Sequence, residues 1–216
     1  MVKLLICGLA NSGKTSLCKT LKDAFIISYD GKPCSLVMPH TNIKNFESID
    51  DLKALVNDKI LKYRDKFFGK LPATVVFDSV SRIEDHIEDY CKVKYRGFDI
   101  WTGVSTEVKN LCDYINSLVD KMNVIIIAHT TYSENAGKYI ETCKGSFAKI
   151  GGFLSTVDYA ITTERSGKKY KVIHRGQTAR TLLDDISSEE NADEFNLQSY
   201  IDKIAEQASK SNEWAI

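Results

Sequence analysis

The chain has 216 residues, of which 43% are hydrophobic and 27% are charged, and its formal net charge is zero. This length and composition are those of one globular domain with a substantial core, and no apolar run approaches the roughly 20 residues of a membrane-spanning helix. A predicted strand begins at once, where a signal peptide would otherwise stand. We therefore expect a cytoplasmic protein with no membrane partner.

The six cysteines are spread along the chain, and none belongs to a Cys-x-x-Cys pair or lies near clustered histidines. This pattern does not indicate a zinc site or a disulfide framework. Several cysteines fall at positions with apolar periodicity, which predicts buried free thiols.

The first predicted element is a short apolar strand at residues 3–7, and the next eight residues read GLANSGKT. This is the phosphate-binding P-loop pattern, and a predicted helix continues from it. Its glycines let the backbone point N–H groups at a polyphosphate, and the helix N-terminus adds positive potential. We expect Lys14 to reach the β- and γ-phosphates of ATP and Thr15 to bind Mg²⁺. The predicted nucleotide-binding residues are Gly8, Asn11, Ser12, Gly13, Lys14, Thr15 and Ser16.

Apolar runs and helical periodicity alternate along the rest of the chain, which predicts an α/β fold with a mostly parallel sheet flanked by helices. Further strands are expected at residues 25–29, 73–78, 123–129, 157–163 and 169–174. Helices are expected at residues 48–67, 80–95 and 106–122, where apolar residues share one helical face. A short connection that contains a glycine joins the last two strands, which is typical of a hairpin.

Charge is distributed unevenly toward the C-terminus. Residues 138–180 contain nine Lys and Arg against three Asp and Glu, whereas residues 181–216 contain two against nine. We predict one domain over residues 1–183 and an acidic tail over residues 184–216, in which residues 195–208 could form a short amphipathic helix. A basic block followed by an acidic tail indicates a polyanion partner, with which the tail could compete for the same basic surface. A solvated charged surface is the alternative.

Two aspartates at predicted strand ends are candidate catalytic residues. Asp78 ends the strand 73–78 in a Walker B pattern, and we expect it to hold Mg²⁺ through water. Ser79 follows it, where many AAA+ ATPases carry a catalytic glutamate, so the group that orients water must come from elsewhere. Asp30 follows the strand 25–29 and would emerge at the carboxyl edge of the sheet, where ligands bind. A simple turn formed by Asp30 and Gly31 is the alternative.

Other polar residues are weaker or different candidates. Glu47 and Glu84 are weaker candidates for the group that orients water. His129 ends the buried strand 123–129 beside the predicted site. It is predicted to sense the γ-phosphate and to pass that signal to the next loop, and a structural role is the alternative.

These residues together resemble the RecA-like core ATPases, and more narrowly the compact phage nucleotide-binding proteins of single-strand annealing or recombination. The resemblance covers residues 1–180 and rests on short segments: residues 8–15, 25–30, 77–79, 127–129, 145–154 and 157–159. In RecA-like proteins the strand after the P-loop helix ends in a catalytic acid. The resemblance therefore implies this role for Asp30, which replaces the glutamate usual in RecA.

The resemblance also implies that residues 133–152 contact single-stranded DNA, through lysines on phosphates and aromatic rings on bases. A lid over the nucleotide or a solvated loop is the alternative. The DNA-binding candidates are Lys138, Lys144, Phe147 and Lys149. A homo-oligomeric ring or filament is implied as well, in which a neighbouring protomer donates a basic residue to the ATP site. The candidates for this residue are Arg175, Lys168 and Arg165.

The expected function is that of a cytoplasmic RecA-like ATPase, encoded by a phage, that requires Mg²⁺ and acts on single-stranded DNA in recombination or annealing. A single-strand-binding or other recombination protein is an expected partner. Two rival functions remain. One is a small-molecule or nucleotide kinase, although no Arg-rich lid helix is evident. The other is a nucleotide-dependent switch or scaffold that does not hydrolyse ATP, which the absence of a glutamate after Asp78 permits.

Overall fold

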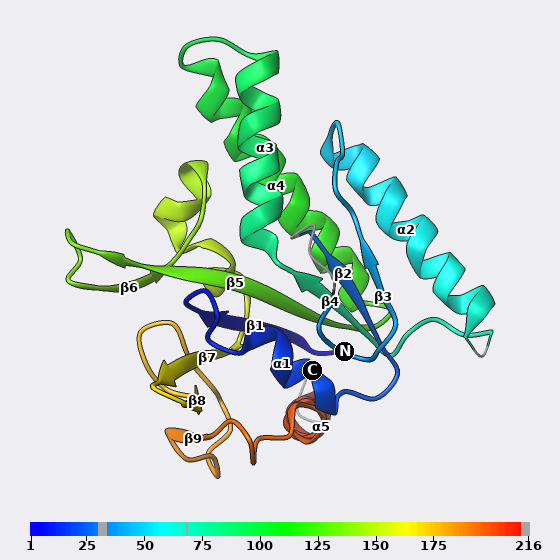
Figure 1. The fold of residues 1–216 in the computed structure, drawn as a ribbon, viewed down its shortest axis with the longest axis vertical. Helices are drawn as coiled ribbons and strands as arrows, with labels where there is room; N and C mark the ends of the chain where they lie inside the picture. The colour runs from blue at the N-terminus through cyan, green and yellow to red at the C-terminus, as the bar shows by residue number, and fades with distance from the viewer. Residues whose placement is uncertain (30–33, 68, 213–216) are drawn as a thin grey trace.

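The computed structural model describes residues 1–29, 34–67 and 69–212, and it shows a mostly parallel sheet with helices on both faces (Figure 1). Within these residues the nine-stranded sheet has the order β3-β2-β4-β5-β1-β7-β8-β9, and β6 pairs with β5. The strands are β1 (Lys3–Gly8), β2 (Ala24–Ser28), β3 (His40–Asn42), β4 (Thr74–Asp78), β5 (Asn123–Ser133), β6 (Lys138–Glu141), β7 (Tyr159–Ser166), β8 (Lys169–Ile173) and β9 (Glu189–Asn191). The helices are α1 (Lys14–Leu17), α2 (Ile49–Lys66), α3 (Val80–Lys94), α4 (Asp99–Val119) and α5 (Leu197–Asn212). The predicted α/β fold class is confirmed.

The central strands set the position of the site. β1 lies in parallel register between β5 and β7, and β5 separates β1 from β4. β4 pairs in parallel with β2, with Ser28 opposite Asp78. Because these strands are parallel, their carboxyl ends share one edge of the sheet, where open α/β sheets bind ligands. The strand that precedes residue 30 therefore lies directly beside the strand that ends at Asp78.

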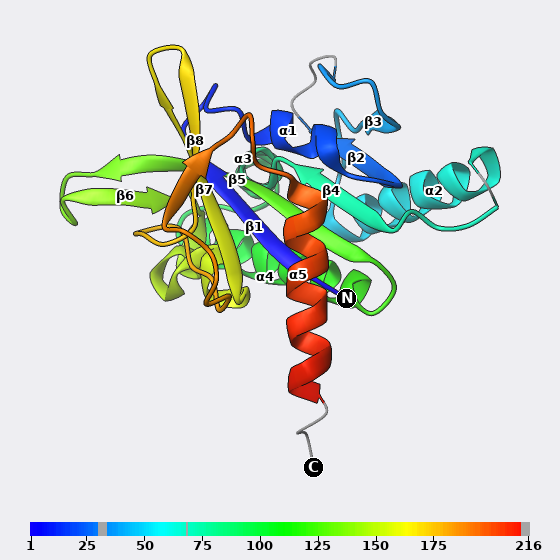
Figure 2. The ribbon, with the colours of Figure 1, turned by 90° about the horizontal axis from the view of Figure 1, so that it is seen from below.

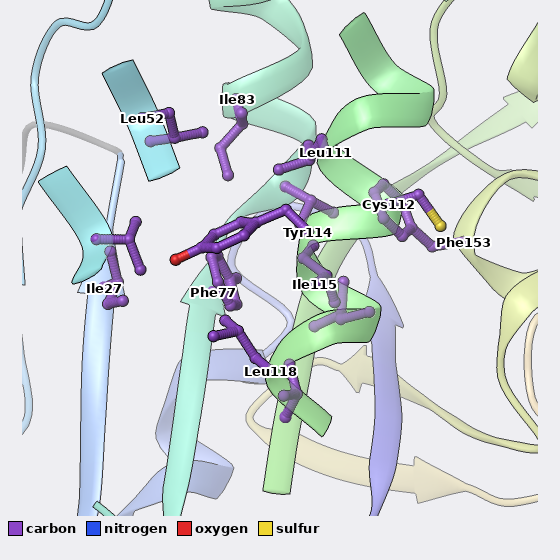
Figure 3. Packing of buried hydrophobic residues seen from close by; sticks show 14 of the residues in the cluster. Ile27, Leu52, Phe77, Ile83, Leu111, Cys112, Tyr114, Ile115, Leu118 and Phe153 are labelled. Carbon is purple, nitrogen blue, oxygen red and sulfur yellow. The ribbon is translucent and has the colours of Figure 1, made fainter. Parts of the chain in front are cut away.

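Helices α2, α3 and α4 cover one face of the sheet, and their apolar stripes form one hydrophobic core with its strands. In Figure 3, Tyr114 of α4 reaches between Phe77 of β4 and Leu52 of α2. The Tyr114 hydroxyl donates a hydrogen bond to Asn57 Oδ1 of α2 at 2.9 Å. Because helices cover both faces, the central strands are apolar throughout rather than alternating.

Helices α1 and α5 cover the opposite face of the sheet (Figure 2). Their apolar residues and those of the strands form a second hydrophobic core. The long helix α5 crosses this face beneath β1 and buries four residues that recur with helical spacing. These residues are Leu197, Tyr200, Ile201 and Ile204.

The predicted acidic tail is wrong for the described residues after 183. β9 pairs antiparallel with β8, and α5 packs against the sheet. The expected helix at residues 195–208 is present but extends from Leu197 to Asn212. Summed charge misled the prediction because it does not register the apolar residues of the same segment, which are buried against the sheet. The segment is therefore part of the folded domain and not an appended tail.

Two further elements differ from expectation. The helix after the P-loop ends at Leu17 and continues as a 3-10 turn, Cys18–Thr20. β5 extends beyond the predicted strand end at residue 129 to Ser133, and it forms an antiparallel hairpin with β6. Within the residues that the structure describes, none of the helices has the length and apolar character needed to cross a membrane.

Candidate nucleotide-binding site

The loop after β1 forms a cradle because two glycines let the backbone pass close to its neighbours. Gly8 has a φ of 154°, and a Cβ there would lie 2.6 Å from the carbonyl oxygen of Thr163. Gly13 has a φ of 88° and directly precedes α1. A side chain at Gly8 would collide with β7, and one at Gly13 would strain the backbone. These two positions therefore fit a loop that curls around a polyphosphate.

The side chains of Lys14, Thr15 and Asp78 meet beneath this loop. The buried Lys14 Nζ donates hydrogen bonds to the carbonyl oxygens of Gly8 at 2.8 Å and Leu9 at 2.7 Å. Thr15 Oγ1 donates to Asp78 Oδ2 at 2.8 Å. Hydroxyl and carboxylate oxygens are the ligands that Mg²⁺ prefers, and a buried ammonium favours a neighbouring anion. The structure thus brings together the three residues that the sequence predicts for phosphate and Mg²⁺.

His129 lies beside this group because of the strand order. β5 runs between β1 and β4, and His129 stands directly opposite Gly8 in the register. Its Nδ1 lies 3.4 Å from Lys14 Nζ, and this nitrogen must be the acceptor because an ammonium has no lone pair. Its backbone N–H donates to Ser81 Oγ at the start of α3, at 2.9 Å. His129 therefore connects the P-loop with the helix that follows Asp78.

A cleft of about 870 Å³ opens over these side chains. It is lined by every predicted nucleotide-binding residue except Gly8, and by Asp78 and His129. Its volume lies in the range of small-molecule sites. Tyr170 and Asp193 also line the cleft, and neither is among the residues that the sequence predicts for the site. No local motif marks them, since only the pairing of β8 with β7 and β9 brings them to the P-loop.

Asp30 falls outside the described residues, and its predicted role stays a prediction. The residue before it, Tyr29, donates its N–H to the carbonyl oxygen of Asp78 at 2.8 Å. The chain is therefore next to Asp78 immediately before residue 30. Among the described residues, the weaker candidates Glu47 and Glu84 do not line the cleft.

The three predicted trans-acting residues, Arg165, Lys168 and Arg175, are all exposed and lie on or directly after the β7–β8 hairpin. Arg165 and Arg175 line a second cleft together with Gly8 of the same chain. Both arginines therefore stand beside the P-loop of their own chain. Lys168 lies in the turn between the two strands.

The predicted DNA-binding segment needs two corrections. Phe147 is buried and packs edge-to-face on Phe153, with ring centroids 5.2 Å apart, so it belongs to the core and does not offer a face to a base. Lys144 Nζ forms ion pairs with Glu88 at 2.7 Å and Asp85 at 3.3 Å on α3. A lysine held by two carboxylates joins the segment after β6 to α3. The spacing of aromatic residues and lysines along the sequence does not show whether a side chain packs against another residue or faces solvent.

The other two candidates, Lys138 and Lys149, are exposed. Lys138 lies on β6 beside Tyr139, which pairs with Tyr132 of β5 across the hairpin. The two tyrosine rings meet edge-to-face with centroids 5.4 Å apart, and both are exposed. The hairpin, rather than the segment around Phe147, carries the exposed aromatic rings.

Two buried carboxyl groups lie at the base of this hairpin. Glu141 ends β6 and accepts the N–H groups of Phe153 at 3.2 Å and Leu154 at 2.8 Å. Burial raises the pKa of Glu141 to about 7. Burial, aided by the charge of Glu141, raises the pKa of Glu84 on α3 to about 9. Burial therefore favours the neutral form of both carboxyl groups, more strongly for Glu84 than for Glu141.

Because of these two raised pKa values, we expect the free energy of unfolding to depend on pH. Their ordinary pKa is 4.5, so the folded state holds protons that the unfolded state releases. The stability they contribute is complete below about pH 4.5 and is lost as the pH rises through about 7 and then about 9. We expect Glu84→Gln to flatten the fall in unfolding free energy above pH 7, which reaches about 1.4 kcal/mol per pH unit for one group.

Urea unfolding of wild type and Glu84→Gln across this pH range measures the effect, with the exposed Asp89→Asn as the control that should keep the wild-type slope. Equal slopes for wild type and Glu84→Gln would show that Glu84 is already ionised in the folded protein.

The fold and the site define a class. The P-loop lies between a strand and a helix, and its lysine and threonine lie beside the aspartate that ends another parallel strand of the same sheet. This is the arrangement of P-loop nucleotide-binding proteins. The family model described as AAA domain matches residues 1–180. The chain therefore belongs to this AAA domain family and is a P-loop ATPase.

Comparison with curated proteins finds no match. Among solved structures, one similar chain is a KaiC-like protein from the hyperthermophilic archaeon Pyrococcus horikoshii OT3, with a TM-score of 0.49 and 10% identity over 88% of this chain and 84% of that chain. Another is a prototypical ATPase from the type III secretion system of pathogenic bacteria, with a TM-score of 0.48 and 12% identity. That match covers 76% of this chain and 52% of the other.

Proposed function

We propose that the protein binds ATP with Mg²⁺ in the 870 Å³ cleft and hydrolyses it. The hydrogen bond between Thr15 Oγ1 and Asp78 Oδ2, at 2.8 Å beneath the loop that carries Lys14, supports this proposal most directly. It sets two oxygen ligands side by side at the place where a cation between the β- and γ-phosphates would be held. When bound, Mg²⁺ would neutralise charge on these phosphates.

The remaining residues have distinct roles in this proposal. Lys14, now held by two carbonyl oxygens, donates to the β- and γ-phosphates. Asp30, two residues beyond the partner of Asp78 in β2, orients the attacking water. His129 couples the phosphate state to the β5–β6 hairpin, because β5 runs without interruption from the P-loop edge into that hairpin.

Asp78→Asn tests the Mg²⁺ role. The amide keeps the size of the side chain but loses the charge that attracts a divalent cation, so we expect kcat to fall at least about 100-fold, or about 2.7 kcal/mol. ATP affinity measured without Mg²⁺ should change little. Phosphate release at several Mg²⁺ concentrations measures the effect, with the exposed Asp65→Asn as the control. A kcat for Asp78→Asn equal to that of wild type would remove Asp78 from the mechanism.

The second part of the proposal is that the β5–β6 hairpin binds single-stranded DNA in phage-type recombination or annealing, in the host cytoplasm. Tyr132 and Tyr139 offer exposed rings, and Lys138 and Lys149 offer exposed cations. Exposed rings and cations suit a flexible polyanion whose bases are unstacked. A single-strand-binding or other recombination protein would then share this substrate.

Variants of the hairpin should separate its two kinds of contact. Tyr132→Ala removes one stacking ring and should weaken binding of a dT oligonucleotide by about 1–3 kcal/mol. Lys138→Ala removes one phosphate contact and should reduce the salt slope of log K by about 0.7. Fluorescence anisotropy at several salt concentrations measures both effects, and the exposed Lys121→Ala is the control. Wild-type affinity and slope in both variants would dismiss the hairpin as the DNA contact.

We also propose that the active form is a homo-oligomeric ring or filament. In such an assembly Lys168, in the exposed turn of the β7–β8 hairpin, would reach the ATP site of a neighbour, where a cation can raise phosphoryl-transfer rates about 10³–10⁵-fold. Light scattering with and without ATP tests the assembly. A monomer under both conditions, with ATP hydrolysis intact, would contradict it.

A further inference from the structure

A second cleft, of about 550 Å³, lies directly beside the P-loop. It is bounded by the start of the P-loop, the ends of β5 and β7, the segment after β8, and Tyr139 of β6. It shares Ala10 and Ser12 with the nucleotide cleft. A ligand bound here would therefore be separated from the phosphates in the P-loop only by the loop itself.

The floor of this second cleft is a set of buried hydroxyl groups. Thr162, Thr163 and Thr178 are each at most 9% exposed. The hydroxyls of Thr162 and Thr178 lie 2.8 Å apart, and that of Thr163 lies 2.6 Å from Ser12 Oγ. A hydroxyl both donates and accepts hydrogen bonds, so this floor matches a ligand with hydroxyl or amide groups of its own. The contact with Ser12 connects the floor to the P-loop.

Two arginines stand among the lining residues. Arg165 Nε donates to the carbonyl oxygen of Gly167, and Arg175 Nη2 donates to that of Leu183, each at 2.8 Å. These bonds anchor each guanidinium through one of its five donors. Within the described part of the chain, neither arginine forms an ion pair with a carboxylate. Two anchored guanidinium groups beside a polar cavity are suited to a phosphate group, which they recognise by charge and by their planar fork.

An aromatic side chain borders the cleft on the side of the hairpin. Tyr139 lines the cleft, and its backbone N–H donates to Gln177 Oε1 of the opposite wall at 3.0 Å. This bond joins the β5–β6 hairpin to the segment after β8. A tyrosine ring offers a face on which a planar base stacks.

From this arrangement we propose that the second cleft binds a nucleoside monophosphate unit. Arg165 and Arg175 hold its phosphate, the threonine hydroxyls pair with its sugar or base edge, and Tyr139 stacks on its base. The unit comes either from a free mononucleotide or from one nucleotide of a bound single strand. The second source rests on the DNA binding proposed above, whereas the first does not.

The test titrates dTMP and, separately, a dT oligonucleotide into the protein with its P-loop saturated by a non-hydrolysable ATP analogue. Arg175→Gln is compared with Arg180→Gln, an exposed arginine of the same segment that does not line the cleft. We expect Arg175→Gln to raise the Kd of at least one probe about tenfold or more, because a charged hydrogen bond is lost. Arg180→Gln should leave both Kd values unchanged. Arg165→Gln should repeat the effect, which guards against a folding defect in one variant.

The outcomes identify the source. Weakened dTMP binding assigns the cleft to a free mononucleotide, and weakened oligonucleotide binding alone assigns it to a strand. The proposal is overturned if wild type binds neither probe, or if Arg175→Gln and Arg165→Gln both bind them as wild type does. The affinity for the ATP analogue is measured on the same samples, and its absence in wild type would reject the proposed ATP site. In that case dTMP titrated alone still tests the second cleft.

Discussion

Lys14→Ala is expected to abolish useful ATP binding while leaving the fold intact. Lys14 Nζ is held by the carbonyl oxygens of Gly8 and Leu9 at the point where a β- or γ-phosphate would lie. Losing a charge-assisted contact of this kind weakens binding by about 2–3 kcal/mol, or about 30- to 150-fold in Kd. Calorimetric titration of ATP with Mg²⁺ measures the change.

Lys22→Ala is the matched control, because Lys22 is an exposed lysine a short distance along the same chain segment. It should bind ATP as wild type does. The thermal midpoint of Lys14→Ala should show that the variant is folded. A folded Lys14→Ala protein with wild-type ATP affinity would mean that ATP binds outside the P-loop.

Truncation after Asp184 is expected to unfold the domain, although charge alone would mark the removed segment as a dispensable acidic tail. The segment buries five large side chains against β1, β8 and their neighbours: Phe195, Leu197, Tyr200, Ile201 and Ile204. At about 1.5–3 kcal/mol each, their burial contributes about 8–15 kcal/mol as an upper estimate. The whole stability of a domain is about 5–15 kcal/mol. Circular dichroism of the truncated chain should therefore show no cooperative thermal transition.

Point variants in α5 also test whether this helix stabilises the domain, and they do so without shortening the protein. Ile204→Ala, at a buried position, should lower the unfolding free energy by about 2–5 kcal/mol. Lys203→Ala, at the exposed neighbouring position, should stay within about 0.5 kcal/mol of wild type. A truncated protein with a wild-type midpoint, or equal effects of the two point variants, would restore the tail interpretation.

The P-loop and the central strands were predictable because their signals are local. Gly8 and Gly13 are required by backbone conformations that few other residues adopt, so they mark the loop in the sequence itself. The strand that ends at Asp78 is apolar throughout because both faces are covered, and such a run is recognisable without knowing its neighbours. The helix at residues 48–67 was placed by its apolar spacing within a residue of α2 at each end.

The misses share a different cause, which is that burial depends on distant partners. Phe147 belongs to the core because Phe153 meets it, and Lys144 is held by carboxylates on α3. From the sequence alone, Phe147 is interpreted as an exposed aromatic residue and Lys144 as a lysine available to bind phosphate. Tyr170 has no motif of its own and becomes part of the site only because β8 pairs beside β7.

Residue type and short-range spacing are enough to identify the P-loop, its lysine and threonine, the aspartate that ends a buried strand, and the α/β class. Only the tertiary structure decided that β5 lies between β1 and β4, which sets His129 3.4 Å from Lys14. It also decided that the acidic C-terminal segment covers the sheet and that a second cleft opens beside the P-loop. Strand order, burial and cavities arise from contacts between residues far apart in the chain, and the free energy of those contacts leaves no local pattern.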